Sequence, residues 1–239
     1  IYSKIKNFIN STNLRNLELT NHSLKSDDIY SLSILQPLLV DLPYLPLNGG
    51  ALRPTCIAYI INEIIIRQRK NIFEFGSGLS TIIMARLIKK NDLDIKITTV
   101  EHNKEWAEIV KRYLVNEDLL QHVTIITADL KEIDTPLGNV YWYDCNKILQ
   151  IIQQEKFDLI IVDGPPANNE NIKHSRLPAF TKLNSNLMDD FCLVLDDANR
   201  SGEKNITEHF KNLNRDINLS IVSQTLAVFR SKSNFNPIP

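Results

Sequence analysis

The sequence predicts an α/β fold: a doubly wound, mostly parallel seven-stranded sheet whose last strand is antiparallel. From residue 70 onward, short apolar runs alternate with segments of helical periodicity, and such alternation produces parallel strands joined by right-handed crossovers. The run Leu159–Val162 is apolar throughout, as expected of a strand buried on both faces. The last two runs, at 218–222 and 226–229, are separated only by Ser223–Thr225. Because this link is too short for a helical crossover, the two strands must pair antiparallel.

The individual elements follow from the points where the periodicity changes. Pro54 is placed to lie in the first turn of a helix, where proline is tolerated, and the apolar face of this helix extends over 54–69. We expect strands at 71–75, 95–101, 122–127, 157–162, 190–196, 218–222 and 226–229. We expect further helices near 79–90, 103–115, 146–154, 174–185 and 201–212.

The length of the chain favours one core. With 239 residues and 43% hydrophobic content, the chain can build one sizeable domain more readily than two, and we assign that domain to residues 51–239. Residues 1–50 are polar, with short amphipathic segments such as Asp28–Leu35 that are stable only when packed on something else. We expect this region to form a helical cap or an oligomerisation arm, through which the chain forms a homodimer.

Charge and cysteine content exclude several classes of partner. The 27 basic and 28 acidic side chains leave a net charge of -1, so nothing favours binding to nucleic acid or to an anionic membrane. Cys56, Cys145 and Cys192 lack the spacing of a zinc site or a disulfide framework. No apolar run approaches the ~20 residues that span a bilayer, and the first residues lack the features of a signal peptide. We therefore expect a cytoplasmic protein with a small-molecule or glycan partner.

Glycine and acidic residues follow the first two predicted strands. Gly76, Ser77 and Gly78 occupy the turn before a predicted helix, where glycine lets the backbone approach a ligand and the N–H groups of the helix start face it. Glu101 ends the second strand, where a carboxylate can accept hydrogen bonds from ribose hydroxyls. The alternative is that Glu101 caps the helix beginning near Asn103. This pattern favours a nucleotide-type cofactor.

Four motifs carry a family resemblance: EFGSGLST, TTVEHNKEW, ITADL and FDLIIVDGPP, in this order. Together they resemble class I S-adenosylmethionine (SAM)-dependent methyltransferases over residues 50–230, which implies a Rossmann-like methyltransferase fold and SAM as cofactor. The cofactor-binding residues implied by the resemblance are Glu74, Gly76, Ser77, Gly78, Ser80, Thr81, Glu101, His102, Asp129 and Asp163. In that family the first glycine motif surrounds the methionine part, the acid at Glu101 the ribose, and the acid at Asp129 the adenine amino group. For Asp129 a role as a helix or turn cap remains the alternative.

Three aspartates follow the fourth and fifth predicted strands. Asp163 comes after FDLIIV, and Asp196 and Asp197 come after FCLVL. Carboxyl ends of parallel strands share one edge of the sheet, and neighbouring strands lie about 5 Å apart, so these carboxylates should converge. Like charges this close repel unless a cation neutralises them, and oxygen ligands suit Mg²⁺. The alternative is that Asp163 binds cofactor or acts alone as a base while Asp197 caps the next helix.

The acidic arrangement resembles catechol O-methyltransferase and the macrolide-sugar O-methyltransferases, whose Mg²⁺ binds the acceptor hydroxyls. As catalytic residues we predict Asp163, His174 and Arg200, with His174 a general base in the absence of metal. Arg176 and Arg200 are placed either to contact substrate or to pair with the aspartates. The aromatic run Tyr141–Tyr143 has two interpretations, packing in the core or a wall that stacks on the acceptor.

Taken together, these residues predict a SAM-dependent O-methyltransferase that acts, with divalent-metal assistance, on a hydroxyl of a sugar, a glycan or another small hydroxylated acceptor. Bacterial methyltransferases associated with glycan modification are the members resembled most. Three alternatives are a catalytically idle cofactor-binding scaffold, an aminopropyl transferase and an NAD-dependent oxidoreductase. A fold and a cofactor site do not by themselves define an acceptor.

Overall fold

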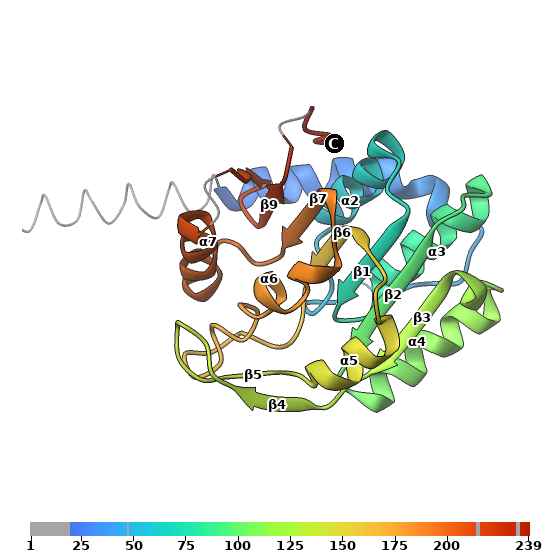
Figure 1. The fold of residues 1–239 in the computed structure, drawn as a ribbon. Coiled ribbons are helices and arrows are strands. Elements are labelled where there is room, and N and C mark those ends of the chain that lie inside the picture. The colour runs from blue at the N-terminus through green and yellow to red at the C-terminus, as the bar shows by residue number, and fades with distance from the viewer. Residues whose placement is uncertain (1–19, 47, 214–215, 233–234) are drawn as a thin grey trace, which may run out of the picture.

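A computed structural model describes residues 20–46, 48–213, 216–232 and 235–239 of the chain. Its main sheet has seven strands in the order β3-β2-β1-β6-β7-β9-β8 (Figure 1). The strands are β1 (Asn71–Phe75), β2 (Lys96–Glu101), β3 (Val123–Thr127), β6 (Phe157–Val162), β7 (Leu187–Leu195), β8 (Asn218–Val222) and β9 (Leu226–Arg230). All neighbours are parallel except β9, which runs antiparallel to both β7 and β8. The predicted doubly wound sheet with an antiparallel last strand is confirmed.

Two helical layers cover the sheet, each packed on its own apolar core (Figure 1). One layer contains a helix at 20–35, α2 (Pro54–Arg67), α3 (Leu79–Asn91) and α4 (Lys104–Asn116). The other contains α5 (Cys145–Ile152), α6 (Ala179–Lys182) and α7 (Ser201–Leu213). Strand β6 contributes Leu159 and Ile161 to the first core, and Ile160 and Val162 to the second. Its continuous apolar run is therefore buried on both faces, as predicted.

The predicted helix at 174–185 is wrong over most of its length. Residues 171–178 form successive turns, and α6 starts only after Pro178. Proline has no N–H to donate and its ring clashes with the carbonyl four residues earlier, so it kinks or breaks a helix that would run through this position. A short 3₁₀ turn, Asn184–Asn186, then leads into β7.

A hairpin that the sequence analysis did not predict lies beside the sheet. Strands β4 (Leu130–Ile133) and β5 (Val140–Tyr143) pair antiparallel. Trp142 and Tyr143 are buried, and the Trp142 ring lies 4.7 Å from that of Phe75 between centroids, whereas Tyr141 is 53% exposed. Packing in the core therefore accounts for Trp142, but Tyr143 also lines the cavity described below.

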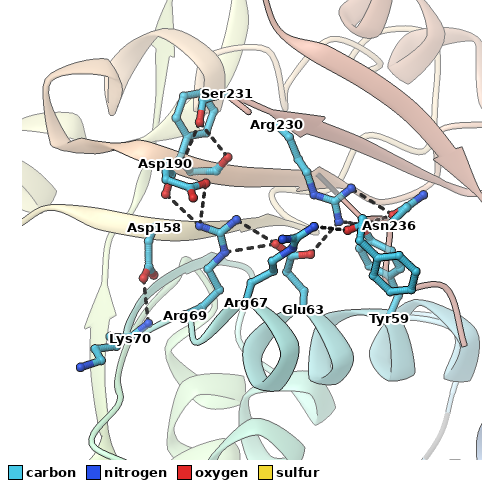
Figure 2. A network of polar contacts seen from close by, with 12 residues as sticks. Tyr59, Glu63, Arg67, Arg69, Lys70, Asp158, Asp190, Arg230, Ser231 and Asn236 are labelled. Carbon is cyan, nitrogen blue, oxygen red and sulfur yellow. Dashed lines mark hydrogen bonds and ion pairs between the residues drawn. The ribbon is translucent and has the colours of Figure 1, made fainter. Parts of the chain in front are cut away.

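An ionic network lies at the opposite edge of the sheet from the carboxyl ends of the parallel strands (Figure 2). Glu63 of α2 is fully buried between two arginines, 2.9 Å from Arg69 and 2.6 Å from Arg230. Arg69 also reaches Asp190 of β7. The Tyr59 hydroxyl donates to Asn236 over 2.8 Å. The network thus joins α2, β7, β9 and the segment 235–239.

Among the described residues, none of the helices combines the length and apolarity needed to cross a bilayer. The expectation of an N-terminal cap concerns residues 1–50, of which 1–19 lie outside the described residues. The helix at 20–35 contributes Leu35 to the core that also contains Ile57 of α2. The division of the chain near residue 50 stays a prediction.

Candidate active site

The glycine turn after β1 is in direct backbone contact with the end of β6. Gly76 has φ of +94°, and a Cβ atom built on it would lie 3.1 Å from the carbonyl carbon of Asp163. Only glycine combines this left-handed conformation with so close an approach. The Asp163 N–H donates to Phe75 O over 2.9 Å, and the Gly76 N–H donates to Val100 O over 2.9 Å. The three strand ends therefore form one rigid platform.

Glu74 lies beneath this turn and holds the start of α3. Its side chain is completely buried, and its two carboxylate oxygens accept hydrogen bonds from Ser80 and Thr81, each at 2.5 Å. Burial raises the pKa of Glu74 to about 7, although these two hydrogen bonds oppose the shift. Thr81 in turn accepts from the Gly78 N–H over 2.9 Å. The structure thus places Glu74 and Thr81 as supports of the glycine turn.

Glu101 stands at the end of β2, facing the same turn. Its carboxylate accepts from the Ser77 N–H at 3.2 Å and the Asn103 N–H at 2.8 Å, and lies 3.0 Å from Nδ1 of His102. The indole N–H of Trp106 donates to Ser77 O over 2.8 Å. Glu101 therefore contacts the helix start, as the capping alternative requires, and also borders the cavity.

A cavity of about 950 Å³ opens above these strand ends. This volume lies within the range of small-ligand sites. Its wall combines the glycine turn, the ends of β2, β6 and β7, and two residues of the helix at 20–35, Asp28 and Leu32. Asp28 is fixed there because it accepts from Arg53 over 2.8 Å and from the Thr55 hydroxyl over 2.9 Å. The described part of the N-terminal region thus forms one side of the cavity.

The three predicted aspartates converge on the wall of this cavity. Asp163, Asp196 and Asp197 each offer a carboxylate oxygen, and these oxygens lie within 4.8 Å of one another. A cation with ligands at roughly 2.0–2.6 Å needs oxygens about 3–5 Å apart, so the spacing of these carboxylate oxygens fits Mg²⁺ or Ca²⁺. Burial, followed by the charge of Asp196, raises the pKa of Asp163. Burial, followed by the charge of Asp197, raises the pKa of Asp196 to about 6.

Arg176 is the buried counter-charge of this aspartate cluster. Its guanidinium donates to Asp197 Oδ2 at 3.1 Å and Asp163 Oδ1 at 3.3 Å, and to backbone carbonyls that include Asp163 O and Asp196 O. Arg200 lies 2.6 Å from the same Oδ2 of Asp197 and is 40% exposed. Of the two roles considered for the arginines, pairing with the aspartates is the one the geometry shows.

Asp197 belongs to the turn ahead of α7, which begins only at Ser201. It has φ of +59°, a left-handed conformation that Asp adopts more readily than most residues. Its carboxylate points to Arg176 and Arg200. The turn thus directs this side chain towards the aspartate cluster.

Six of the predicted site residues are not among the described residues that line this cavity: Glu74, Gly78, Ser80, Thr81, Asp129 and His174. His174 has Nδ1 3.2 Å from Leu137 O and Nε2 3.2 Å from Asn205, so both ring nitrogens face the hairpin and α7. Asp129 has a 72% exposed side chain and pairs with Lys104 at 3.3 Å. Gly78 and Ser80 line a smaller neighbouring cavity of about 260 Å³, which shares Gly76, Ser77 and Asp163 with the first.

A fourth carboxylate, which was not predicted from the sequence, lies near the aspartate cluster. Glu203, in the first turn of α7, is fully buried, and burial raises its pKa to about 7. Within the described part of the chain, neither of its carboxylate oxygens meets a donor from another residue at hydrogen-bonding distance. Acidic residues favour the first turn of any helix, so its sequence position gave no signal of a special role.

The order of the strands, the glycine turn and the acidic strand ends define the fold of class I methyltransferases. The family model described as "Methyltransferase domain" matches residues 73–198, a little over half of the chain. The chain therefore belongs to this methyltransferase family, and the resemblance drawn from its motifs is confirmed. A search of curated proteins gave no significant match.

Solved structures share the fold at low sequence identity. The O-methyltransferase from Bacillus cereus in complex with SAH is 18% identical, with 86% of this chain and 90% of that chain covered and a TM-score of 0.54. TomG, an O-methyltransferase from Streptomyces achromogenes in complex with SAM, is 16% identical over 85% of this chain and 90% of that chain, with a TM-score of 0.53. The SAH-bound methyltransferase PaMTH1 from Podospora anserina is 14% identical, with 93% of this chain and 96% of that chain covered and a TM-score of 0.57.

Proposed function

We propose that this protein transfers the methyl group of SAM to a hydroxyl of a sugar, a glycan or another small hydroxylated acceptor, with the help of a divalent metal ion. The observation that carries the proposal is the meeting of Asp163, Asp196 and Asp197 on the wall of a large cavity, directly beside the glycine turn. Two of the structural neighbours named above are O-methyltransferases that were solved with SAH or SAM.

SAM is proposed to lie across the ends of β1 and β2. There Gly76 and Ser77 present backbone to the cavity, and Glu101 and His102 border it. A carboxylate at the second strand end suits the ribose hydroxyls, and the N–H groups at the start of α3 suit the carboxylate of the methionine part. Glu74, Ser80 and Thr81 would act by keeping that helix start in place, whereas Asp129 would need to exchange its surface partner Lys104 for the adenine amino group.

The acceptor hydroxyl is proposed to lie against the aspartate cluster. Asp163, Asp196 and Asp197 would hold the metal ion, whose chemistry is to lower the pKa of a bound hydroxyl. The cluster would orient the acceptor oxygen towards the methyl carbon, with the hydroxyl proton passing to a carboxylate or to water. As the new O–C bond forms, the C–S bond of SAM breaks and SAH is released. Holding the reacting atoms in line supplies much of the rate enhancement in such transfers.

The wall of the cavity suits a polar acceptor. Arg200 offers a partly exposed guanidinium there, whereas Tyr143, which also lines the cavity, is almost fully buried. The helix at 20–35 would act as a cap, since Asp28 and Leu32 contribute to the wall. The same helix exposes Ile29 (70%) and Tyr30 (59%), which supports a homodimer through this region. The three cysteines are free, in keeping with the reducing cytoplasm.

Chelation tests the metal-dependent part of the proposal. We expect methyl transfer from labelled SAM to a panel of sugars and catechol-like acceptors to fall at least about 100-fold in excess EDTA, because positioned metal ions contribute several kcal/mol to such reactions. Added Mg²⁺ should restore it. Full activity in excess chelator would remove the metal from the account and leave methyl transfer standing.

A further inference from the structure

Arg176 and Glu203 form an incomplete ion pair behind the aspartate cluster. Nη1 of Arg176 lies 3.8 Å from Oε1 of Glu203, and the side chains are only 4% and 0% exposed. The same Nη1 donates to Asp197 Oδ2 at 3.1 Å. Arg176 is thus bound to the aspartates. The buried Glu203 carboxylate lies within ion-pair range of Arg176, but it accepts no hydrogen bond from another described residue. Leaving a charged group without such partners in the protein interior costs free energy.

The position of Arg176 conflicts with a cation held by the same aspartates. Its Nη1 and Nη2 atoms occupy hydrogen-bonding positions on Asp197 and Asp163, both of which belong to the three-aspartate donor set. Two cations that share carboxylates in a site of low dielectric repel each other strongly. A divalent ion would therefore bind tightly only if the guanidinium could move to another acceptor.

Glu203 is the acceptor that the structure provides. We propose that Arg176 is an exchangeable internal counter-ion, which neutralises Asp163 and Asp197 when no metal is bound and turns to Glu203 when a divalent cation enters the aspartate cluster. The inference rests on the metal-assisted function proposed above. A charge-assisted hydrogen bond is about 2.7–2.9 Å long, so the guanidinium needs to approach Glu203 by roughly 1 Å.

The backbone around this pair is fixed, so the movement would be confined to side chains. A Cβ atom on Gly202 would lie 2.1 Å from the carbonyl oxygen of Lys173, which shows that the start of α7 packs directly on the turns carrying Arg176. His174 adds a second tie, because its Nε2 lies 3.2 Å from Asn205 of α7. Glu203 and Arg176 therefore keep their relative backbone positions while the guanidinium turns.

Calorimetric titration with Mg²⁺ alone tests this role of Glu203 without relying on activity. Glu203→Gln removes the charged acceptor to which Arg176 would turn when the metal binds. We therefore expect Mg²⁺ to bind to this variant about tenfold more weakly than to the wild type. Glu203→Asp retains the negative charge but withdraws it from Arg176 by one methylene, and should also weaken binding. Glu208→Gln, on an exposed position of the same helix, should bind as the wild type does. The unfolding midpoint of each variant confirms that it is folded.

The outcomes separate this inference from the proposed function. A wild type that binds no Mg²⁺ overturns the metal-assisted function and the inference with it. A wild type that binds Mg²⁺, with Glu203→Gln within twofold of it, overturns the inference alone. The inference also fails if Glu203→Gln binds weakly while Glu203→Asp equals the wild type, because Glu203 would then act through its charge alone. If Glu203→Gln does not fold, Glu203→Asp decides the question by itself.

Discussion

Asp163→Asn should lower the rate of methyl transfer by at least about 100-fold, the range expected when a group that handles a proton or a reacting oxygen is lost. Asn keeps the shape of the side chain but cannot carry the negative charge or take up a proton. Asp163 joins the two halves of the site, since its backbone contacts the glycine turn and its carboxylate belongs to the aspartate cluster. The measurement is kcat with labelled SAM and the best acceptor found in the screen.

Asp189→Asn is the matched control for this experiment. Asp189 is exposed and lies on β7, the strand that ends directly before Asp196. The Asp189→Asn substitution should therefore leave kcat within twofold of the wild type. Unfolding midpoints of both variants show whether a loss of activity reflects a loss of structure. A folded Asp163→Asn enzyme with nearly normal kcat would exclude Asp163 from the reaction.

Glu63→Ala should lower the free energy of unfolding by about 3–5 kcal/mol, the usual cost of removing one partner from a buried ion pair. Glu63 accepts hydrogen bonds from Arg69 at 3.1 and 2.9 Å and from Arg230 at 2.6 Å, all within the network of Figure 2. Without it, two buried guanidinium groups would face each other with no carboxylate between them. Urea unfolding followed by circular dichroism measures the loss.

The control for the buried network is Glu108→Ala, on the exposed side of α4, which should change the free energy of unfolding by less than about 0.5 kcal/mol. If Glu63→Ala does not accumulate as folded protein, Glu63→Gln, which keeps the shape and part of the hydrogen bonding, should show a smaller loss in the same direction. A change below 1 kcal/mol in Glu63→Ala would contradict the importance assigned to this network.

The fold and the aspartate cluster could be predicted because both depend on local patterns. The apolar run Leu159–Val162 indicates a strand buried on two faces, whatever surrounds it. Parallel strands end at a common edge, so Asp163 and Asp196 must lie close once β6 and β7 are neighbours. The short link at Ser223–Thr225 likewise requires an antiparallel turn. In each case a few adjacent residues contain the necessary information.

Features that depend on contacts distant in the sequence could not be predicted. Pro178 is visible in the sequence and already argues against a helix through 174–185. The pairing of Arg176 with the aspartate cluster, by contrast, is a contact between residues distant in the sequence. Glu203 gains its unusual environment only because α7 packs on the backbone of Lys173. His174 contacts Leu137 through a hairpin that the sequence analysis did not predict. None of these partners is marked by spacing or composition.

Calorimetric titration of the protein with SAM tests the central claim most directly, with NAD titrated in parallel. We expect SAM to bind with a dissociation constant in the micromolar range, as is common for enzyme ligands, and NAD to show no binding. Glu101→Ala should weaken SAM binding about tenfold or more, because hydrogen bonds to a charged group contribute about 1.5–3 kcal/mol. Binding of NAD without binding of SAM, or equal SAM affinity in Glu101→Ala, would contradict the account.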